Sequence, residues 1–254
     1  HFDFGGFGIS DSYATGDVTG AGGNTTYVGG LVGVDYSGPI SNSFATGNVT
    51  SSGQDVGGLV GLAGFSGAVI SNSFATGNVR SALISAGGLV GELVTSASVN
   101  NSYATGAVSG QNNVGGLVGV VNDGTPGSTV TNSYALGNVS GNSRVGGIAG
   151  LVGFNATVTN VYATGSVTGN TDVGGLVGEL RNSDPGILTG SYWNITANPS
   201  LHIGGAGIDA GNPGTATPLT SAQMRDPANF TAFNFSTLPG ATGNMPMTPF
   251  CGSP

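Results

Sequence analysis

Apolar residues recur in short runs along most of this chain, and each run is bounded by Gly, Ser, Thr or Asn. Variants of the phrase Ser-(Tyr/Phe)-Ala-Thr-Gly and of the phrase Gly-Gly-Leu-Val-Gly alternate, and each returns every 28 to 31 residues. Two phrases that keep one period indicate a repeat architecture. The aromatic residue of the first phrase is Tyr13, Phe44, Phe74, Tyr103, Tyr134, Tyr162 and, in a degenerate copy, Tyr192. The second phrase starts at Gly29, Gly57, Gly87, Gly115, Gly146 and Gly174.

The apolar runs are typical of strands rather than helices. They are rich in Val, Ile, Thr and aromatic residues, and no apolar residue returns at a helical spacing of three and four. Glycine at this density would cost a helix about 1 kcal/mol per position. A propeller blade takes about 40–45 residues, which is longer than this period. We therefore predict an all-β fold, a right-handed parallel β-solenoid of six to seven coils.

Stacked coils place like residues above one another, about 4.8 Å apart. Three apolar columns predict the core, and they pass through Ala45, Val49 and Leu59 and their copies. A polar column is expected to form a side-chain ladder that stabilises turns, with a metal or glycan ligand ladder as the alternative. Its members are Asn42, Asn72, Asn101, Asn132 and Asn160, with Asp11 in the first coil.

The repeat weakens after about Arg181, where proline becomes frequent. We assign residues 1–190 to the solenoid and residues 191–254 to a C-terminal cap of the same structural unit, because repeat arrays need atypical ends. Thr220 and Gln223 have the spacing of a capping box, which predicts one short helix before Pro227. At the other end, an aromatic segment is either a first partial coil or a candidate assembly strand, with Phe2, Phe4 and Phe7 as its apolar residues.

Charge excludes several classes of function. Charged residues make up 6% of the chain, which has no Lys, four Arg and a formal net charge of −8. A nucleic-acid surface needs a basic stripe, which four scattered Arg cannot form. No apolar stretch is long enough to span a membrane. With 38% apolar residues at regular spacing, the chain is not a disordered linker. The first residue is His1, and we expect a processed segment of a secreted protein.

Catalytic signatures are missing from the pattern. His1 and His202 do not form a His-Glu-x-x-His zinc motif, and no base accompanies the single cysteine, Cys251. Asp55 and Asp172 share one place in the repeat, and Glu92 and Glu179 share another. Each pair lies several coils apart, so we expect no compact acidic site. The prediction is a protein without catalysis, cofactors or metal ions.

A row of threonines is the remaining candidate for a binding surface. It consists of Thr15, Thr46, Thr76, Thr105 and Thr164, with Leu136 as an interruption. A flat outward wall of such residues suits a glycan- or ice-binding module. The alternative is that Thr is simply favoured in strands and turns.

The phrases Gly-Gly-Leu-Val-Gly and Asn-Ser-(Tyr/Phe)-Ala-Thr-Gly-Asn-Val together resemble the GLUG-type repeats of bacterial adhesin-like surface and secreted proteins. Similar repeats occur in the non-catalytic part of IgA-specific metallopeptidases. The resemblance implies a right-handed β-solenoid outside the cell and carries no activity. We therefore expect a non-enzymatic, extracellular structural or adhesive protein, with end-to-end assembly into a cell-surface filament as one option. Its partners would be copies of itself or cell-surface glycans. The alternatives are the glycan- or ice-binding module and, less favoured, a polysaccharide-acting enzyme.

Overall fold

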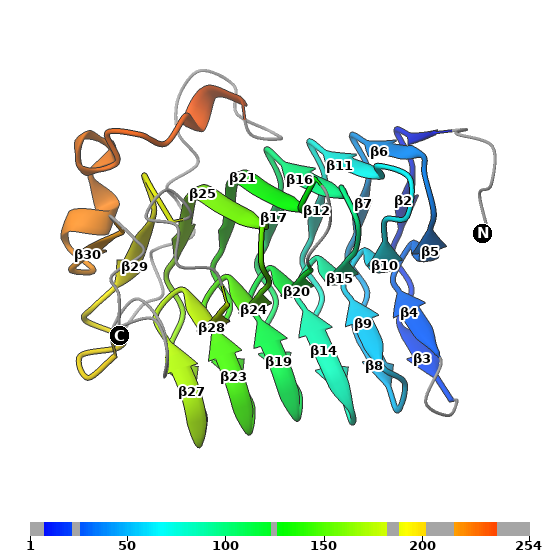
Figure 1. Cartoon of the computed structure of the whole chain (residues 1–254), viewed down its shortest axis with the longest axis horizontal. Helices are drawn as coiled ribbons and strands as arrows, with labels where there is room; N and C mark the ends of the chain where they lie inside the picture. Colours follow the sequence, from blue (N-terminus) through cyan, green and yellow to red (C-terminus); the bar gives the residue numbers. More distant parts are fainter. Residues whose placement is uncertain (1–7, 22–25, 123–125, 182–187, 202–215, 238–254) are drawn as a thin grey trace.

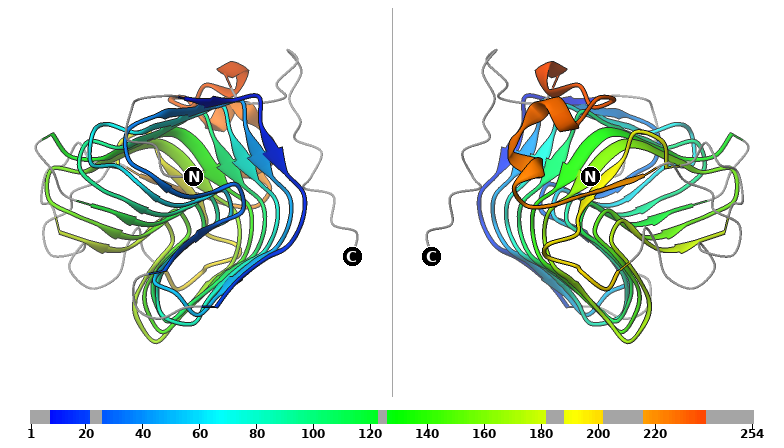
Figure 2. Two further views of the ribbon diagram at one scale, coloured as in Figure 1. Left: turned by 90° about the vertical axis from the view of Figure 1, so that its right-hand side faces the viewer. Right: turned by 90° about the vertical axis from the view of Figure 1, so that its left-hand side faces the viewer.

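The computed structural model describes residues 8–21, 26–122, 126–181, 188–201 and 216–237. In these ranges the chain winds through six coils of short strands, all paired in parallel with their copies in the next coil. The coils are stacked along the long axis of the molecule (Figure 1) and have closely similar outlines when viewed along it (Figure 2). The predicted all-β parallel solenoid is thus confirmed.

Four sheets run the length of the solenoid, and we name them A to D in the order in which the chain visits them. Sheet A contains β1 (Ile9–Ser10), β2 (Tyr13–Ala14), β6 (Pro39–Ser41), β7 (Phe44–Ala45), β11 (Val69–Ser71), β12 (Phe74–Ala75), β16 (Ser98–Asn100), β17 (Tyr103–Ala104), β21 (Thr129–Ala135), β25 (Thr157–Ala163), β29 (Tyr192–Asn194) and β30 (Thr217–Leu219). Sheet B contains β3 (Val18–Gly20), β8 (Val49–Ser51), β13 (Val79–Ser81), β18 (Val108–Ser109), β22 (Val139–Ser140) and β26 (Val167–Thr168).

Sheets C and D complete each coil. Sheet C contains β4 (Tyr27–Gly29), β9 (Asp55–Gly57), β14 (Ile84–Gly87), β19 (Asn112–Gly115), β23 (Ser143–Gly146) and β27 (Thr171–Gly174). Sheet D contains β5 (Val32–Asp35), β10 (Val60–Ala63), β15 (Val90–Leu93), β20 (Val118–Val121), β24 (Ala149–Val152) and β28 (Val177–Leu180). Like residues pair with like at many positions, for example Val60 with Val90 and Ala75 with Ala104.

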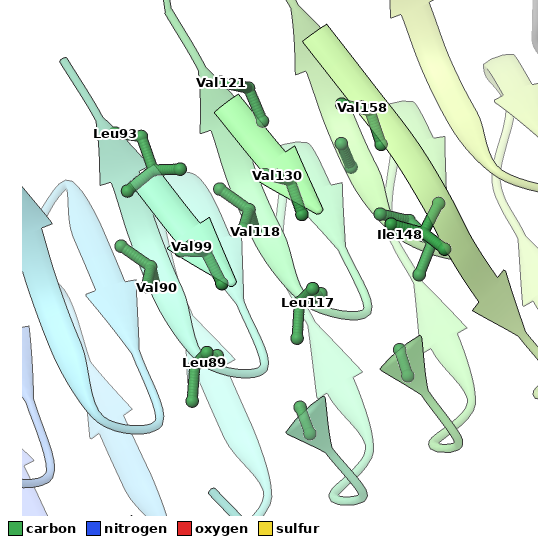
Figure 3. Close-up of a cluster of buried hydrophobic side chains, with 14 of the residues drawn as sticks. Leu89, Val90, Leu93, Val99, Leu117, Val118, Val121, Val130, Ile148 and Val158 are labelled. Atoms are coloured by element: carbon green, nitrogen blue, oxygen red, sulfur yellow. The ribbon is translucent and has the colours of Figure 1, made fainter. Parts of the chain in front are cut away.

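The interior has two apolar cores. The larger one lies between sheets A and D, where Leu89, Leu117 and Ile148 repeat from coil to coil (Figure 3). The smaller core lies between sheets B and C and consists almost entirely of valine, such as Val79 and Val114. The narrow cross-section depends on glycine at the turn from sheet C to sheet D. A Cβ on Gly88 would overlap the carbonyl oxygen of Gly116 and lie 2.7 Å from the Ala104 Cβ.

The C-terminal part extends sheet A by β29 and β30 and then forms three short 3-10 helices, η1 (Gln223–Arg225), η2 (Pro227–Asn229) and η3 (Phe235–Thr237). The expected reciprocal bonds are present, since the Thr220 amide donates to Gln223 Oε1 (2.9 Å) and the Gln223 amide donates to Thr220 Oγ1 (3.2 Å). The element that follows is a single 3-10 turn ending at Arg225, before Pro227. The strands β29 and β30 and the helices η1 and η2 lie at one end of the solenoid (Figure 1), whereas η3 reaches back over sheet A, where the Thr237 hydroxyl donates to Asn101 Oδ1 at 2.8 Å.

Candidate functional site

One face of each coil presents alternate residues to the outside along β7, the following turn and β8, and along the equivalent segments of the other coils. In the second coil Thr46, Asn48 and Thr50 are exposed, whereas Ala45 and Val49 are buried. The alternation follows from the two-residue period of extended chain. We call this face the outer wall. It carries an aromatic column, a threonine column, an Asn/Asp column and a Thr/Ser column in which Arg80 is the exception.

The aromatic column is a continuous stack. The rings of Tyr13, Phe44, Phe74, Tyr103, Tyr134 and Tyr162 lie parallel within 10°, with centroids 4.8–5.3 Å apart. Phe230 and Phe233 contact Tyr162 edge-on, with centroids at 5.2 and 4.9 Å. Exposure falls along the column from 66% at Tyr13 to 4% at Tyr162. Burial accordingly raises the pKa of Tyr134 and Tyr162 well above the ordinary value.

This stack limits what the aromatic column can bind. A carbohydrate packs on the flat face of an aromatic ring, but the faces in the interior of the stack are already covered by neighbouring rings. Only ring edges remain for a ligand along most of the column. The aromatic column therefore stabilises the solenoid. The groups of the outer wall that could hydrogen-bond a ligand are those of the polar columns.

The predicted threonine row is exposed only in part. Thr15, Thr46 and Thr76 are exposed, Thr105 is half-buried and Thr164 is buried. The C-terminal segment accounts for this gradient, since Asn194 Nδ2 donates to the Thr164 carbonyl oxygen at 3.2 Å. Together with Leu136, this cover leaves an incomplete row in the last coils.

The predicted asparagine column has a backbone role. Asn42, Asn72, Asn101, Asn132 and Asn160, and also Asp11, all have φ between 46° and 52°. Asn and Asp tolerate this left-handed conformation better than other non-glycine residues. They bend the chain in sheet A, for example between β6 and β7. Among the described residues, no hydrogen bond links the side chains of this column from one coil to the next.

A hydrogen-bonded Asn/Asp ladder exists elsewhere, on the outer wall. Asp17 Oδ1 accepts from the Asn48 amide (2.7 Å), Asn48 Oδ1 from the Asn78 amide (3.0 Å) and Asn78 Oδ1 from the Ala107 amide (2.9 Å). The recurrence of Asn after Thr-Gly is the sequence signal for this ladder. Sequence reasoning assigned the ladder to the wrong asparagine column, because the repeat contains two of them.

A second ladder is buried. Ser43, Ser73, Ser102 and Ser133 are fully buried, and each hydroxyl donates to the carbonyl oxygen two residues earlier at 2.7–2.8 Å. Each hydroxyl also accepts from the serine amide one coil earlier, as in Ser43 N to Ser73 Oγ (3.1 Å). These hydroxyls restore the backbone bonds that the left-handed bend interrupts. The serine that precedes each aromatic residue of the repeat is the sequence signal for this buried ladder.

Two carboxyl groups meet where sheets C and D adjoin, contrary to the expectation that no compact acidic site forms. Asp55 in β9 and Glu92 in β15 are in hydrogen-bonding contact, although they belong to adjacent coils and different sheets. Asp55 is 3% exposed, and its Oδ1 has no hydrogen-bond partner among the described residues. Asn122 Nδ2 donates to Glu92 Oε1 at 2.9 Å. Alignment of the repeats places Asp55 at the position of Asp172 and gives no sign of its contact with Glu92 of the next coil.

The environment of this pair favours protonation. Burial raises the pKa of Asp55 to about 6, although hydrogen bonds from Ser85 and Glu92 oppose the shift. Burial, followed by the negative charge of Asp55, raises the pKa of Glu92 to about 7, against the hydrogen bond from Asn122. Two carboxylates at hydrogen-bonding distance cannot both ionise without a large penalty. The pair therefore retains a proton close to neutral pH.

The equivalent place three coils further on holds an ion pair instead. Arg144 in β23 bonds to Glu179 in β28 through its Nε, and Arg181 Nε lies 3.1 Å from the other oxygen of Glu179. Here a guanidinium takes the role that Asp55 has opposite Glu92, so the glutamate is neutralised by a cation rather than by a proton. The fold therefore accepts two different solutions for charge at this site.

The remaining candidates do not form a site. No group of three or more His, Cys, Asp or Glu that could hold a metal ion occurs in the described parts of the chain. Phe2, Phe4 and Phe7 of the predicted assembly strand lie outside the described residues, as do His202 and Cys251. Within the described ranges, no helix has the length and apolar character needed to cross a membrane.

Comparison with known proteins rests on the repeat itself. The model of the GLUG motif matches residues 52–80 and 141–168. The chain therefore contains the GLUG motif in two of its coils. Each match runs from the turn after sheet B through sheets C, D and A and back to sheet B, so one GLUG motif corresponds to one coil. No curated protein and no solved structure matches the chain.

Proposed function

We propose that this protein is a non-catalytic, extracellular β-solenoid that acts as a rigid adhesive module. The observation that carries the proposal is the outer wall, where hydrogen-bonding side chains are repeated in register along the coils. Its Thr, Asn and Ser side chains project from strands that are held in register by the serine ladder and the Asn/Asp ladder. A preorganised row of this kind loses little entropy on binding an extended partner.

The acidic residues support a role without catalysis. General acid–base chemistry requires a carboxyl group that reaches the substrate. Asp55 is buried, and the Asp55–Glu92 pair belongs to sheets C and D, whereas the outer wall is formed by strands of sheets A and B. A glycosidase further needs its two carboxyl groups about 5 Å or more apart, whereas these two are in direct contact.

End-to-end assembly is a second form of structural function, and the strand order favours it at three sheets. Sheets B, C and D each end on a strand with one described neighbour, for example β26 and β3 of sheet B. Sheet A does not favour assembly at its C-terminal end, because its last strand there is β30. Pro218 in that strand has no amide hydrogen to donate, which is a common protection of sheet edges. Light scattering at high protein concentration tests assembly, and a monomer would exclude it.

Binding of the protein to arrays of glycans and to matrix-coated surfaces tests the adhesive function. The double variant Thr46→Lys/Thr76→Lys places bulky charges on the outer wall without touching the core. The control, Phe65→Lys, changes an exposed loop residue that is 53% accessible. We expect the wall variant to lose binding and the control to keep it. Equal binding by the two variants, or no binding to any surface, would refute the proposal.

Ice binding is a weaker alternative for the same wall, because Arg80 and Leu136 interrupt its columns and the last coils are covered. A measurement of thermal hysteresis separates it from glycan binding, since a glycan-binding wall produces none.

A further inference from the structure

A groove lies at the turns between sheets B and C, beside the fourth column of the outer wall. Its volume is about 430 Å³, which is within the range of small-ligand sites. It crosses the third to sixth coils. The lining includes Arg80, Ser109, Gln111, Ser140, Asn142 and Asn170.

The groove results from a change in turn length. The inward residues of sheets B and C lie seven positions apart in the third coil, from Val79 to Ala86, but six apart in the fourth, from Val108 to Val114. The fifth and sixth coils keep the shorter turn. The surface therefore steps inward after the third coil. Ala82, in the longer turn, and Arg80 line the groove at this step.

The lining is polar and contains no carboxylate or aromatic side chain. Gln111, Asn142 and Asn170 form a column with one side-chain amide per coil. The backbone N–H of Asn142 donates to the backbone carbonyl oxygen of Gln111 (2.8 Å), and the side-chain Nδ2 of Asn170 donates to Asn142 Oδ1 (2.8 Å). The coil spacing sets these groups about 4.8 Å apart. Amides and hydroxyls at a constant spacing are suited to hydrogen-bonding a chain of sugar hydroxyls.

Arg80 adds one positive charge to this neutral surface. It stands in register with Thr50 and Ser109, so its column is otherwise made of hydroxyl side chains. Arg144 and Arg181 are paired with Glu179, whereas Arg80 has no ion pair or hydrogen bond within the described part of the chain. An exposed guanidinium without a partner is available for a bidentate contact with a carboxylate.

We propose that this groove binds an acidic oligosaccharide, with its carboxylate on Arg80 and its hydroxyl groups on the amides of Gln111, Asn142 and Asn170. The inference rests on the proposed adhesive function and assigns it a ligand class. The ligand carries few charges, because a polyanion would be repelled by a chain of net charge −8 and would find one cation. A largely apolar ligand would lack partners in this lining.

Calorimetric titration with short oligosaccharides whose single charged residue is a terminal glucuronate or sialate tests the proposal, with each ligand compared with its neutral methyl ester. We expect the wild-type protein to bind at least one acid, and to bind its ester at least about tenfold more weakly, since a charge-assisted hydrogen bond is lost. Arg80→Thr restores the residue type of the second coil and should bind acid and ester equally. Asn142→Ala/Asn170→Ala should weaken both ligands alike.

Arg225→Thr is the matched control, because it removes an exposed cation in η1, outside the groove lining, and should leave both affinities unchanged. The proposal is overturned if no acid in the set binds, or if Arg80→Thr keeps the wild-type preference for acid over ester. If adhesion to glycan surfaces persists and depends on Thr46 and Thr76 in those cases, the proposed function stands and only the groove is excluded. Loss of adhesion as well would remove both.

Discussion

The contact between Asp55 and Glu92 makes a sharp prediction about stability and pH. The substitution Glu92→Gln keeps the shape of the side chain and leaves an oxygen that can accept from Asn122. The amide group that it introduces can also donate to Asp55, as the protonated carboxyl does. The variant therefore imitates the protonated pair at every pH and removes the proton uptake that the wild-type pair requires.

The sign follows from where the protons are bound. In the unfolded chain both carboxyls lose their protons near pH 4, whereas the folded pair retains them until about pH 6 and 7. The folded state thus binds more protons between pH 4 and 7, and the unfolding free energy contributed by the pair falls as the pH rises through that window. It is fully present below pH 4 and lost above pH 7.

The size of the effect is set by the shifts. A shift of about two pH units for one group corresponds to about 3 kcal/mol, because one unit is worth about 1.4 kcal/mol. The two groups repel each other, and this repulsion contributes to both shifts, so we expect about 3 to 6 kcal/mol for the pair. Glu92→Gln should therefore stabilise the protein by about 3 kcal/mol at pH 8 and have little effect at pH 4.

Chemical unfolding of the two proteins at a series of pH values measures the difference. Glu179→Gln is the control, because it stands at the equivalent place opposite Arg144 and Arg181. Loss of this partly exposed ion pair should destabilise the protein at neutral pH by about 1 kcal/mol or less, the opposite sign. If the stability difference between Glu92→Gln and the wild type is the same at pH 4 and pH 8, the reasoning about the buried pair is wrong.

Three further predictions concern contacts between stacked coils, and each is measured as a change in unfolding free energy. Gly88→Ala should cost more than about 3 kcal/mol or prevent folding, because its Cβ would overlap backbone of the next coil; Gly16→Ala, with no atom within 4 Å of the new Cβ, is the control and should be nearly neutral. Ser73→Ala should cost about 1–3 kcal/mol, since it leaves the buried Ser43 amide without a partner; a neutral result would show that backbone rearrangement replaces the ladder. Phe74→Ala interrupts the aromatic stack and should cost about 2–4 kcal/mol, whereas Tyr13→Ala at its exposed end should cost less than about 1 kcal/mol; equal costs would contradict a contribution from stacking.

Much of this fold could be predicted from the period alone. A parallel solenoid repeats the same environment at each coil, so a residue such as Val49 meets its own copy, and alignment of the repeats reveals the contact. The apolar columns, the parallel strands and the coil number follow from this rule. The conformation of Asn42 is harder, because a column of asparagine is consistent with a side-chain ladder or with a left-handed bend, and only backbone geometry separates them.

The sites that could carry function depend on departures from that rule. Asp55 meets Glu92 because sheets C and D face each other across one step of the coil, and a Cβ on Gly91 would lie 2.6 Å from the Val56 amide. Alignment of like with like pairs Glu92 with Leu62 and gives no sign of this diagonal contact. The groove beside Arg80 depends on one residue fewer in a turn. In this solenoid, the shared period therefore specifies the scaffold, whereas the acidic pair and the groove occur where neighbouring coils differ in sequence.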